Sequence, residues 1–176
     1  GLGFIGHNRM LIVPPSDDSG GIGGTMFFLG IVLTDACFDR YDEPQENRCG
    51  SCTRCIDACP THALTLPSPI VATRCLSYQT IENRGELSEE ARHAMGNYIY
   101  GCDRCQQVCP WNRFASPTDI DELQPSGDLL AMKKNDWHLL SEQQFRDLFR
   151  HSAVKRAKYA GLMRNIRAAE DTVSDC

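Results

Sequence analysis

The cysteines are the residues of this chain whose spacing is most informative about chemistry. The sequence has 176 residues and ten cysteines, eight of which fall into two runs and one isolated position. The first run, over residues 49–60, reads C-x2-C-x2-C-x3-C-P, a bacterial iron–sulfur pattern in which the last cysteine serves the other cluster. The second run, over residues 102–110, reads C-x2-C-x3-C-P. Together the runs predict two [4Fe–4S] clusters.

The spacing also predicts which thiolates share a cluster. Three cysteines of one tight loop can bind three irons of a cube, so the fourth thiolate must come from elsewhere in the chain. The first cluster is assigned to Cys49, Cys52, Cys55 and Cys109. The second cluster is assigned to Cys59, Cys75, Cys102 and Cys105. The two remaining cysteines, Cys37 and Cys176, are interpreted as ordinary side chains.

Two other uses of these cysteines fit their spacing less well. Paired C-x2-C units also bind zinc, but three cysteines at successive three-residue steps followed by Cys-Pro fit a tetrahedral zinc site poorly. Disulfides are disfavoured because the closely spaced thiols would not form a bridged framework and no secretory signal precedes them. Iron–sulfur ligation is the preferred interpretation.

Composition and length restrict the class of protein. The mass of 19.7 kDa allows one domain with a modest core. The longest apolar stretch, residues 26–33, is too short to cross a bilayer, so no membrane association is expected. Many free thiolates indicate a reducing compartment, which predicts the cytoplasm. The glycine-rich opening without Met suggests a fragment of a longer protein.

Charge is unevenly distributed along the chain. The net charge is −5, yet residues 145–168 contain seven Lys or Arg against the single acid Asp147. An acidic body with a basic tail predicts an anionic partner for the tail. A solvated helix face is the simpler alternative for such a cluster.

Local patterns predict a mixture of strands and helices. Residues 10–13 and 26–33 are short and rich in branched or aromatic side chains, which is typical of strands. A helix is predicted over residues 75–82, and another should begin after the N-cap Ser88. Ser141 with Gln144 three residues later predicts a capping box, and a last helix should follow Ser152.

Thiolate-bound cubes transfer single electrons, so an electron carrier of the ferredoxin type is the simplest function. A carrier needs little beyond its cluster loops, whereas most of this chain lies outside them and includes the basic tail. An acceptor downstream of the clusters is therefore the better hypothesis.

Seven short motifs are spread over the chain: GLGFIG (1–6), MFFLG (26–30), RCLSYQTIE (74–82), GNYIYGCD (96–103), CPWNRF (109–114), SAVKRAK (152–158) and GLMRN (161–165). Together they make the chain similar to epoxyqueuosine reductases. The resemblance implies a cobalamin enzyme, related in architecture to reductive dehalogenases, that removes the epoxide oxygen from epoxyqueuosine in the tRNA anticodon loop to give queuosine. The chain would be the C-terminal portion of such a protein, lacking the N-terminal region.

The resemblance implies an α+β fold with four parts. Residues 1–38 would be the end of a cobalamin-binding reductase domain, and residues 39–116 a ferredoxin-like double [4Fe–4S] domain. Residues 117–136 would be a linker. Residues 137–176 would begin a helical, HEAT-like repeat that binds tRNA.

The same likeness implies residues for cofactor and RNA. Seven positions are expected to contact cobalamin: Gly6, His7, Leu11, Phe28, Ser77, Thr80 and Asp103. Six are expected to contact tRNA: Asn83, Arg84, Lys155, Arg156, Lys158 and Arg164. A plain core role stays open for Leu11 and Phe28, a surface role for Asp103, and either a metal-ligand or a surface role for His7.

The predicted proton donor of the reaction lies upstream of this chain, so no residue here is assigned as catalytic. The chain alone should bind both clusters, hold cobalamin weakly and turn over little substrate. Its expected partners are tRNA carrying epoxyqueuosine and an external electron donor of the flavodoxin or ferredoxin type, and it is expected to be a monomer.

One alternative is a cobalamin-dependent dehalogenase that acts on small molecules, which would not need the basic tail. A more distant alternative is a zinc-bound nucleic-acid module.

Overall fold

A computed structural model describes residues 1–18 and 20–174, and for residues 170–174 it describes only the backbone. The contacts divide the chain into two compact units. Unit 1 comprises Gly1–Cys59, Leu64–Pro69 and Arg104–Pro117. Unit 2 comprises Pro60–Ala63, Ile70–Asp103 and Thr118–Cys176.

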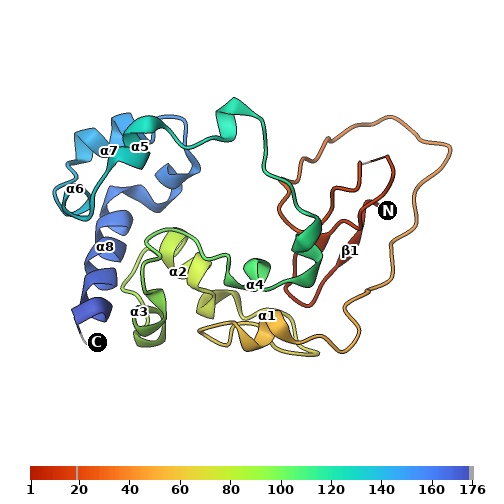
Figure 1. Cartoon of the computed structure of the whole chain (residues 1–176), viewed down its shortest axis with the longest axis horizontal. Coiled ribbons are helices and arrows are strands. Elements are labelled where there is room, and N and C mark those ends of the chain that lie inside the picture. The colour runs from red at the N-terminus through yellow and green to blue at the C-terminus, as the bar shows by residue number, and fades with distance from the viewer. Residues whose placement is uncertain (19, 175–176) are drawn as a thin grey trace. The chain divides into compact units, whose positions relative to one another are not determined.

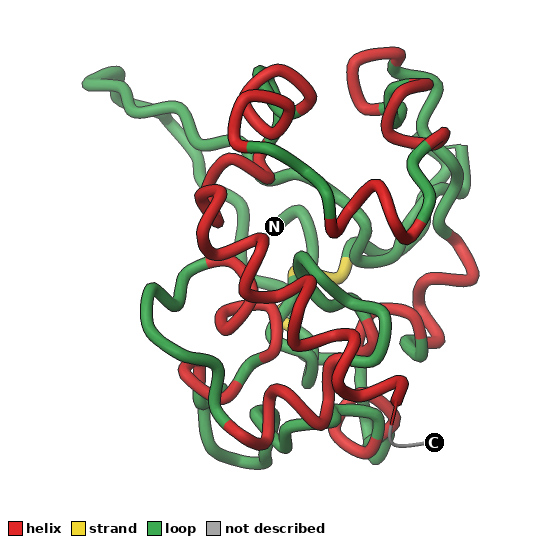
Figure 2. The backbone as a smooth tube through the Cα atoms, turned by 90° about the vertical axis from the view of Figure 1, so that its left-hand side faces the viewer, coloured by secondary structure: helices red, strands yellow, loops and turns green. Residues whose placement is uncertain are grey.

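Unit 1 begins with a small antiparallel hairpin. Strand β1 (Phe4–Ile5) pairs with β2 (Leu11–Ile12), with Phe4 opposite Ile12, and Val13 continues the pairing in a bridge to Gly24. The prediction of a strand over residues 10–13 is therefore confirmed. Gly3 permits this pairing, because a Cβ there would lie only 2.1 Å from the carbonyl oxygen of Ile12. These strands are the two short yellow pieces of the tube in Figure 2.

The predicted strand over residues 26–33 is wrong. Residues 26–48 form no helix or strand, as the orange ribbon of Figure 1 shows. The apolar side chains of this segment are exposed, with Phe28 at 87% and Leu33 at 91% of their accessible surface. A strand exists only through hydrogen bonds to a neighbouring strand, and no described segment pairs with this one.

The cysteine-rich loops of unit 1 carry three short helical turns. These are α1 (Arg54–Asp57), α4 (Arg104–Gln107) and the 3₁₀ turn η2 (Pro110–Phe114). Asn112 fastens the second loop to the hairpin, because its Oδ1 accepts from the backbone N–H of Thr25 at 2.7 Å and its Nδ2 donates to the Gln106 carbonyl at 2.6 Å.

Unit 2 consists of helices, and its cores lie around the last of them. Figure 1 shows α8 (blue) beside α3, and both pack against α2. One core cluster contains Leu140, Phe145, Phe149, Leu162, Met163 and Ile166, and a second contains Leu76, Leu87, Ala91, Met95 and Ala168. The elements of the unit are η1 (Ala72–Arg74), α2 (Leu76–Ile81), α3 (Glu89–Met95), η3 (Asp121–Leu123), α5 (Gly127–Ala131), α6 (Lys134–His138), α7 (Glu142–Leu148), η4 (Ala153–Ala157) and α8 (Lys158–Ser174).

Side-chain caps fix the helix starts that the sequence predicted. The Ser88 side chain accepts a hydrogen bond from the Ala91 N–H at the start of α3, and α3 ends at Gly96. Ser141 and Gln144 form a reciprocal capping box at the start of α7. The predicted linker over residues 117–136 is more ordered than expected, since it contains η3, α5 and the start of α6.

The described chain is mostly helical with one two-stranded sheet. In the part of the chain that the structure describes, no helix combines the length and the apolar character needed to cross a membrane.

Candidate metal centre

A cavity of about 260 Å³ in unit 1 brings together the four cysteines predicted to bind the first cluster. Cys49, Cys52 and Cys55 reach it from the first cysteine run and from α1, while Cys109 comes from the residue before η2. Residues sixty positions apart in the sequence thus line one small space. The cavity thus places Cys109 of the second run together with three cysteines of the first run.

The thiols of this cavity influence one another electrostatically. Burial raises the pKa of Cys49, and the neighbouring Cys109 and Cys52 raise it further, although a hydrogen bond from His7 opposes them. Burial likewise raises the pKa of Cys55, to which Cys49 and Cys109 add. Because like charges raise a pKa only at short range, four thiolates here need a cation or a metal cluster for compensation.

A turn at residues 6–9 supplies hydrogen bonds to the first cysteine run. The backbone N–H of His7 donates to Cys49 Sγ at 3.4 Å. His7 Nδ1 lies 2.9 Å from the carbonyl oxygen of Cys52, so Nδ1 must carry the proton, because a carbonyl only accepts. His7 is half-buried at the cavity, which places it beside the thiols rather than on an isolated surface.

Three exposed arginines also line the cavity: Arg48, Arg54 and Arg113. A [4Fe–4S] cluster with four thiolates carries net negative charge, which guanidinium groups near it offset. The donor set is therefore suited to an anionic iron–sulfur cube. These arginines were not among the predicted site residues, although Arg48 and Arg54 directly precede Cys49 and Cys55.

The thiols are not arranged around a single ion. Among residues 1–18 and 20–174, no three His, Cys, Asp or Glu side chains converge as ligands of one metal. A cube separates its thiolates more widely than one ion does, because each thiolate binds a different iron. Of the cysteines assigned to the second cluster, Cys59 is buried, and Cys75, Cys102 and Cys105 are half-buried.

A second feature is a basic pocket of about 510 Å³ within unit 2, between the loop after α2 and the start of α8. It contains four of the six residues predicted to contact tRNA: Asn83, Arg84, Lys158 and Arg164. Arg92 and Arg167 add two charges that were not predicted. Of the remaining predicted residues, neither Lys155 nor Arg156 lines the pocket, and Arg156 instead pairs with Glu82.

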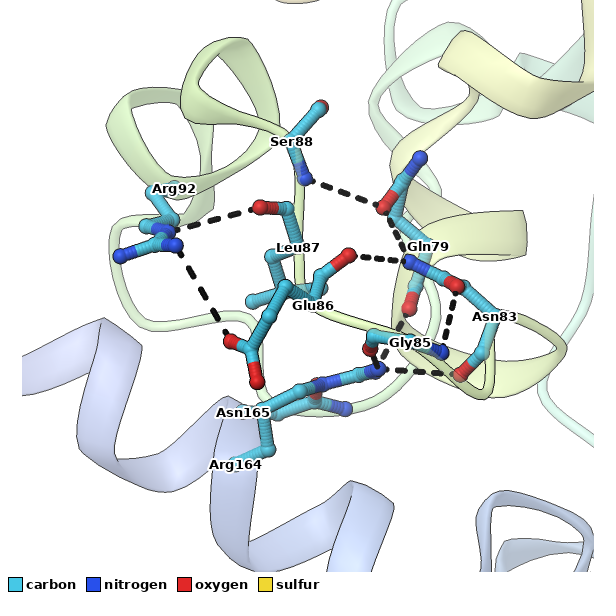
Figure 3. A network of polar contacts seen from close by, with 9 residues as sticks. All are labelled: Gln79, Asn83, Gly85, Glu86, Leu87, Ser88, Arg92, Arg164 and Asn165. Carbon is cyan, nitrogen blue, oxygen red and sulfur yellow. Dashed lines mark hydrogen bonds and ion pairs between the residues drawn. The ribbon is translucent and has the colours of Figure 1, made fainter.

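Arg164 has a structural role in this pocket. Figure 3 shows its guanidinium reaching from α8 into the loop after α2. It donates to the carbonyl oxygens of Gln79 at 2.8 Å and Asn83 at 3.0 Å, and also to that of Gly85. Its donors are thus largely committed to the protein itself, and burial lowers the pKa of the group.

The residues predicted to contact cobalamin lie in different environments. In unit 1, Gly6 closes the turn beside His7, Leu11 is half-buried in β2, and Phe28 is exposed. In unit 2, Ser77 is half-buried in α2, and Asp103 is exposed.

Thr80 differs from the others because it is fully buried. Its hydroxyl donates to the Leu76 carbonyl at 2.9 Å and accepts from the Gly101 N–H at 3.0 Å. In this structure Thr80 fixes the loop before the second cysteine run.

Known proteins that are similar to this chain include iron–sulfur proteins. The family described as "4Fe-4S double cluster binding domain" matches residues 48–112, which include all eight cysteines of the pattern. Over 166 residues, the chain is 41% identical to epoxyqueuosine reductase of Cellulophaga algicola. This chain is similar to epoxyqueuosine reductases over nearly its whole length. The reductase of Escherichia coli K12 is 38% identical over 169 residues.

Solved epoxyqueuosine reductases have the same fold over this region. The Streptococcus thermophilus structure is 33% identical and matches 98% of this chain with a TM-score of 0.79. A reductase crystallised with an epoxyqueuosine-modified tRNA stem loop is 30% identical and matches the whole chain, also with a TM-score of 0.79. The chain spans about half the length of the curated relatives, 52% and 42% for the two named above, and 43% and 44% of these structures.

Proposed function

We propose that this chain is the electron-delivering and RNA-binding part of an oxidoreductase that reduces epoxyqueuosine to queuosine in the tRNA anticodon loop. The observation that carries the proposal is the cavity formed by Cys49, Cys52, Cys55 and Cys109 in a chain similar to epoxyqueuosine reductases. This activity belongs to a whole enzyme. The chain spans only 52% of the length of the Cellulophaga algicola reductase.

Two [4Fe–4S] clusters are proposed as cofactors. The first is assigned to the cavity cysteines, and the three arginines at its rim support an anionic cluster. The second rests on the sequence spacing and on the double-cluster family match. Its proposed ligands are Cys59, Cys75, Cys102 and Cys105.

Cobalamin is the proposed cofactor at which the epoxide is reduced, and when bound it would receive electrons one at a time from the clusters. The residues of this chain would hold it in place. Gly6, His7 and Leu11 belong to one hairpin beside the cavity, and exposed Phe28 offers an apolar surface to a large ring. Ser77 and Asp103 are retained as weaker contacts. We propose that Thr80 acts indirectly, by positioning the loop at Gly101.

The basic pocket of unit 2 is the proposed tRNA surface. Phosphates are bound by exposed cations, which here include Lys158 and Arg167. Arg84 is also exposed, but its guanidinium already donates to the carbonyls of Ile81, Arg156 and Ala157. Asn83 lies at the same pocket, and Lys155 and Arg156 precede it in the chain. Arg164 is proposed to support this surface by shaping the loop, since its donors bond to backbone carbonyls.

An external electron donor of the flavodoxin or ferredoxin type would supply the clusters. The proposed compartment is the cytoplasm, because a chain with ten cysteines, eight of them in an iron–sulfur ligand pattern, needs reducing conditions. We further propose that the chain acts as a monomer.

Salt-dependent binding of an epoxyqueuosine-modified tRNA stem loop tests this function. The affinity of the anaerobically prepared chain is measured at several salt concentrations. Replacing Lys158→Gln or Arg167→Gln should weaken binding and reduce the slope of log K against log salt by about 1 each. Arg146→Gln is the matched control, because Arg146 is exposed on α7 and lies 3.6 Å from Glu142.

Equal salt slopes for all three variants would refute the proposed RNA surface. A chain that retains both clusters but has no affinity for the stem loop would instead be an electron carrier of the ferredoxin type.

A further inference from the structure

One buried amide nitrogen at the metal cavity has no hydrogen-bond partner among the described residues. Asn8 is only 2% exposed, and it lines the same cavity as Cys49 and Cys109. Its Nδ2 donates to no acceptor among the described residues. Buried polar groups are nearly always hydrogen-bonded, because leaving a donor unpaired costs its hydration without compensation. An acceptor that belongs in the cavity would explain this donor.

The orientation of the Asn8 amide is fixed by its other end. Its Oδ1 accepts from the backbone N–H of Met10 at 3.2 Å. A flipped amide would place an NH₂ group against that N–H, so the oxygen must stay there and the nitrogen must face elsewhere.

The turn that carries Asn8 is held firmly. The Gly6 N–H donates to the Met10 carbonyl at 2.9 Å, and the Arg9 N–H donates to the Gly6 carbonyl at 3.0 Å. The Arg9 guanidinium anchors the turn to the carbonyl oxygens of Thr65 and Ser68. Gly6 is needed here, since a Cβ would lie 2.4 Å from Ile12 Cδ1 and 2.9 Å from Asn8 Oδ1.

We propose that Asn8 is a positioning residue whose Nδ2 donates a hydrogen bond to a sulfur of the first cluster, and that this bond raises the reduction potential of that cluster. The inference rests on the proposed function, which assigns the four cavity cysteines to that cluster. Thiolate and sulfide sulfurs accept hydrogen bonds, and such bonds stabilise the more negative, reduced state. The neighbouring His7 N–H, which donates to Cys49 Sγ, acts in the same direction.

A redox titration followed by electron paramagnetic resonance (EPR) tests the proposal. Asn8→Leu removes the donor, and Asn8→Asp keeps the acceptor for Met10 while replacing the donor by an anionic oxygen. At a fixed poised potential, each variant should show about a tenfold lower ratio of reduced to oxidised first cluster, a shift of about 59 mV for one electron. Asn135→Asp, at an exposed position of α6, adds the same charge elsewhere as a control and should leave the ratio unchanged.

The outcomes separate this inference from the proposed function. A lowered potential, or selective loss of the first cluster in Asn8→Asp, supports the hydrogen bond, because an anion then faces the sulfurs. An unchanged potential in Asn8→Asp with full iron content overturns it and indicates that water satisfies the amide. Absence of four-iron clusters from the wild-type chain would refute the cluster assignment itself.

Discussion

At the residue scale, Arg164 has the most extensive bonding of any charged side chain in the basic pocket. Its guanidinium donates hydrogen bonds to three backbone carbonyl oxygens of residues 79–85, and it also donates to Asn165 Oδ1 at 2.9 Å. Asn165 is fully buried and donates to the carbonyls of Thr80 and Ile99. These two side chains therefore bind α8 to the end of α2 and to the loops that follow α2 and α3.

We predict that Arg164→Met destabilises the fold by about 2–4 kcal/mol, because half-buried carbonyls lose their donor. The measurement is the midpoint of urea unfolding, followed by helical circular dichroism. Arg167→Gln, in the same pocket but exposed, should change stability by no more than about 0.5 kcal/mol while still weakening tRNA binding. Equal stabilities for the two variants would contradict a structural role for Arg164.

Residue types and local spacing predicted part of the candidate site. The cysteine assignment follows from sequence because each run is a local loop with a fixed ligand order, and the structure brings the four first-cluster cysteines to one cavity. Asn8 and the bonds of Arg164 were missed. The partners of Arg164 lie far from it in the sequence, and the Asn8 Nδ2 has no partner among the described residues. No short sequence motif marks either residue.

At the element scale, an ion pair joins η1 to α3. The Glu90 carboxylate accepts hydrogen bonds from Arg74 Nη2 at 2.6 Å and Nε at 3.2 Å. These bonds lower the pKa of Glu90 below its ordinary value of 4.5. Because the folded pKa is the lower one, the pair stabilises the fold above about pH 4.5, and this contribution is lost as pH falls through the lowered pKa.

Glu90→Gln should therefore lower the urea midpoint slightly at pH 7, and its difference from wild type should vanish in acid. Urea unfolding at pH 7 and at about pH 3, well below the ordinary carboxyl range, measures this difference. Glu89→Gln removes the same charge from the same helical turn and serves as the control. The pair has no stabilising role if the two variants behave alike at both pH values.

Elements defined by local signals were predicted better than those defined by distant partners. The helices after Ser88 and Ser141 begin where their capping side chains require. The segment 26–33 has the composition of a strand but finds no described partner strand, so composition alone was misleading. The order within residues 121–138 was also missed, since its helices are only three to five residues long.

At the scale of the whole molecule, eight cysteines are proposed to bind two four-iron clusters, with one cysteine exchanged between the two runs. The other proposed features depend on these clusters. The roles proposed for Asn8, His7 and the three arginines require a cluster in the cavity that they line. Reduction of a bound tRNA likewise requires electrons from the clusters.

The most direct test is the iron and sulfide content of the anaerobically prepared chain, together with its EPR signals after reduction. We predict about eight irons and about eight sulfides per wild-type chain, and about four of each in Cys109→Ala. Cys37→Ala is the control, because Cys37 is exposed and outside the pattern, and it should match wild type. Full iron content in Cys109→Ala, or far less than eight irons in the wild-type chain, would contradict the assignment.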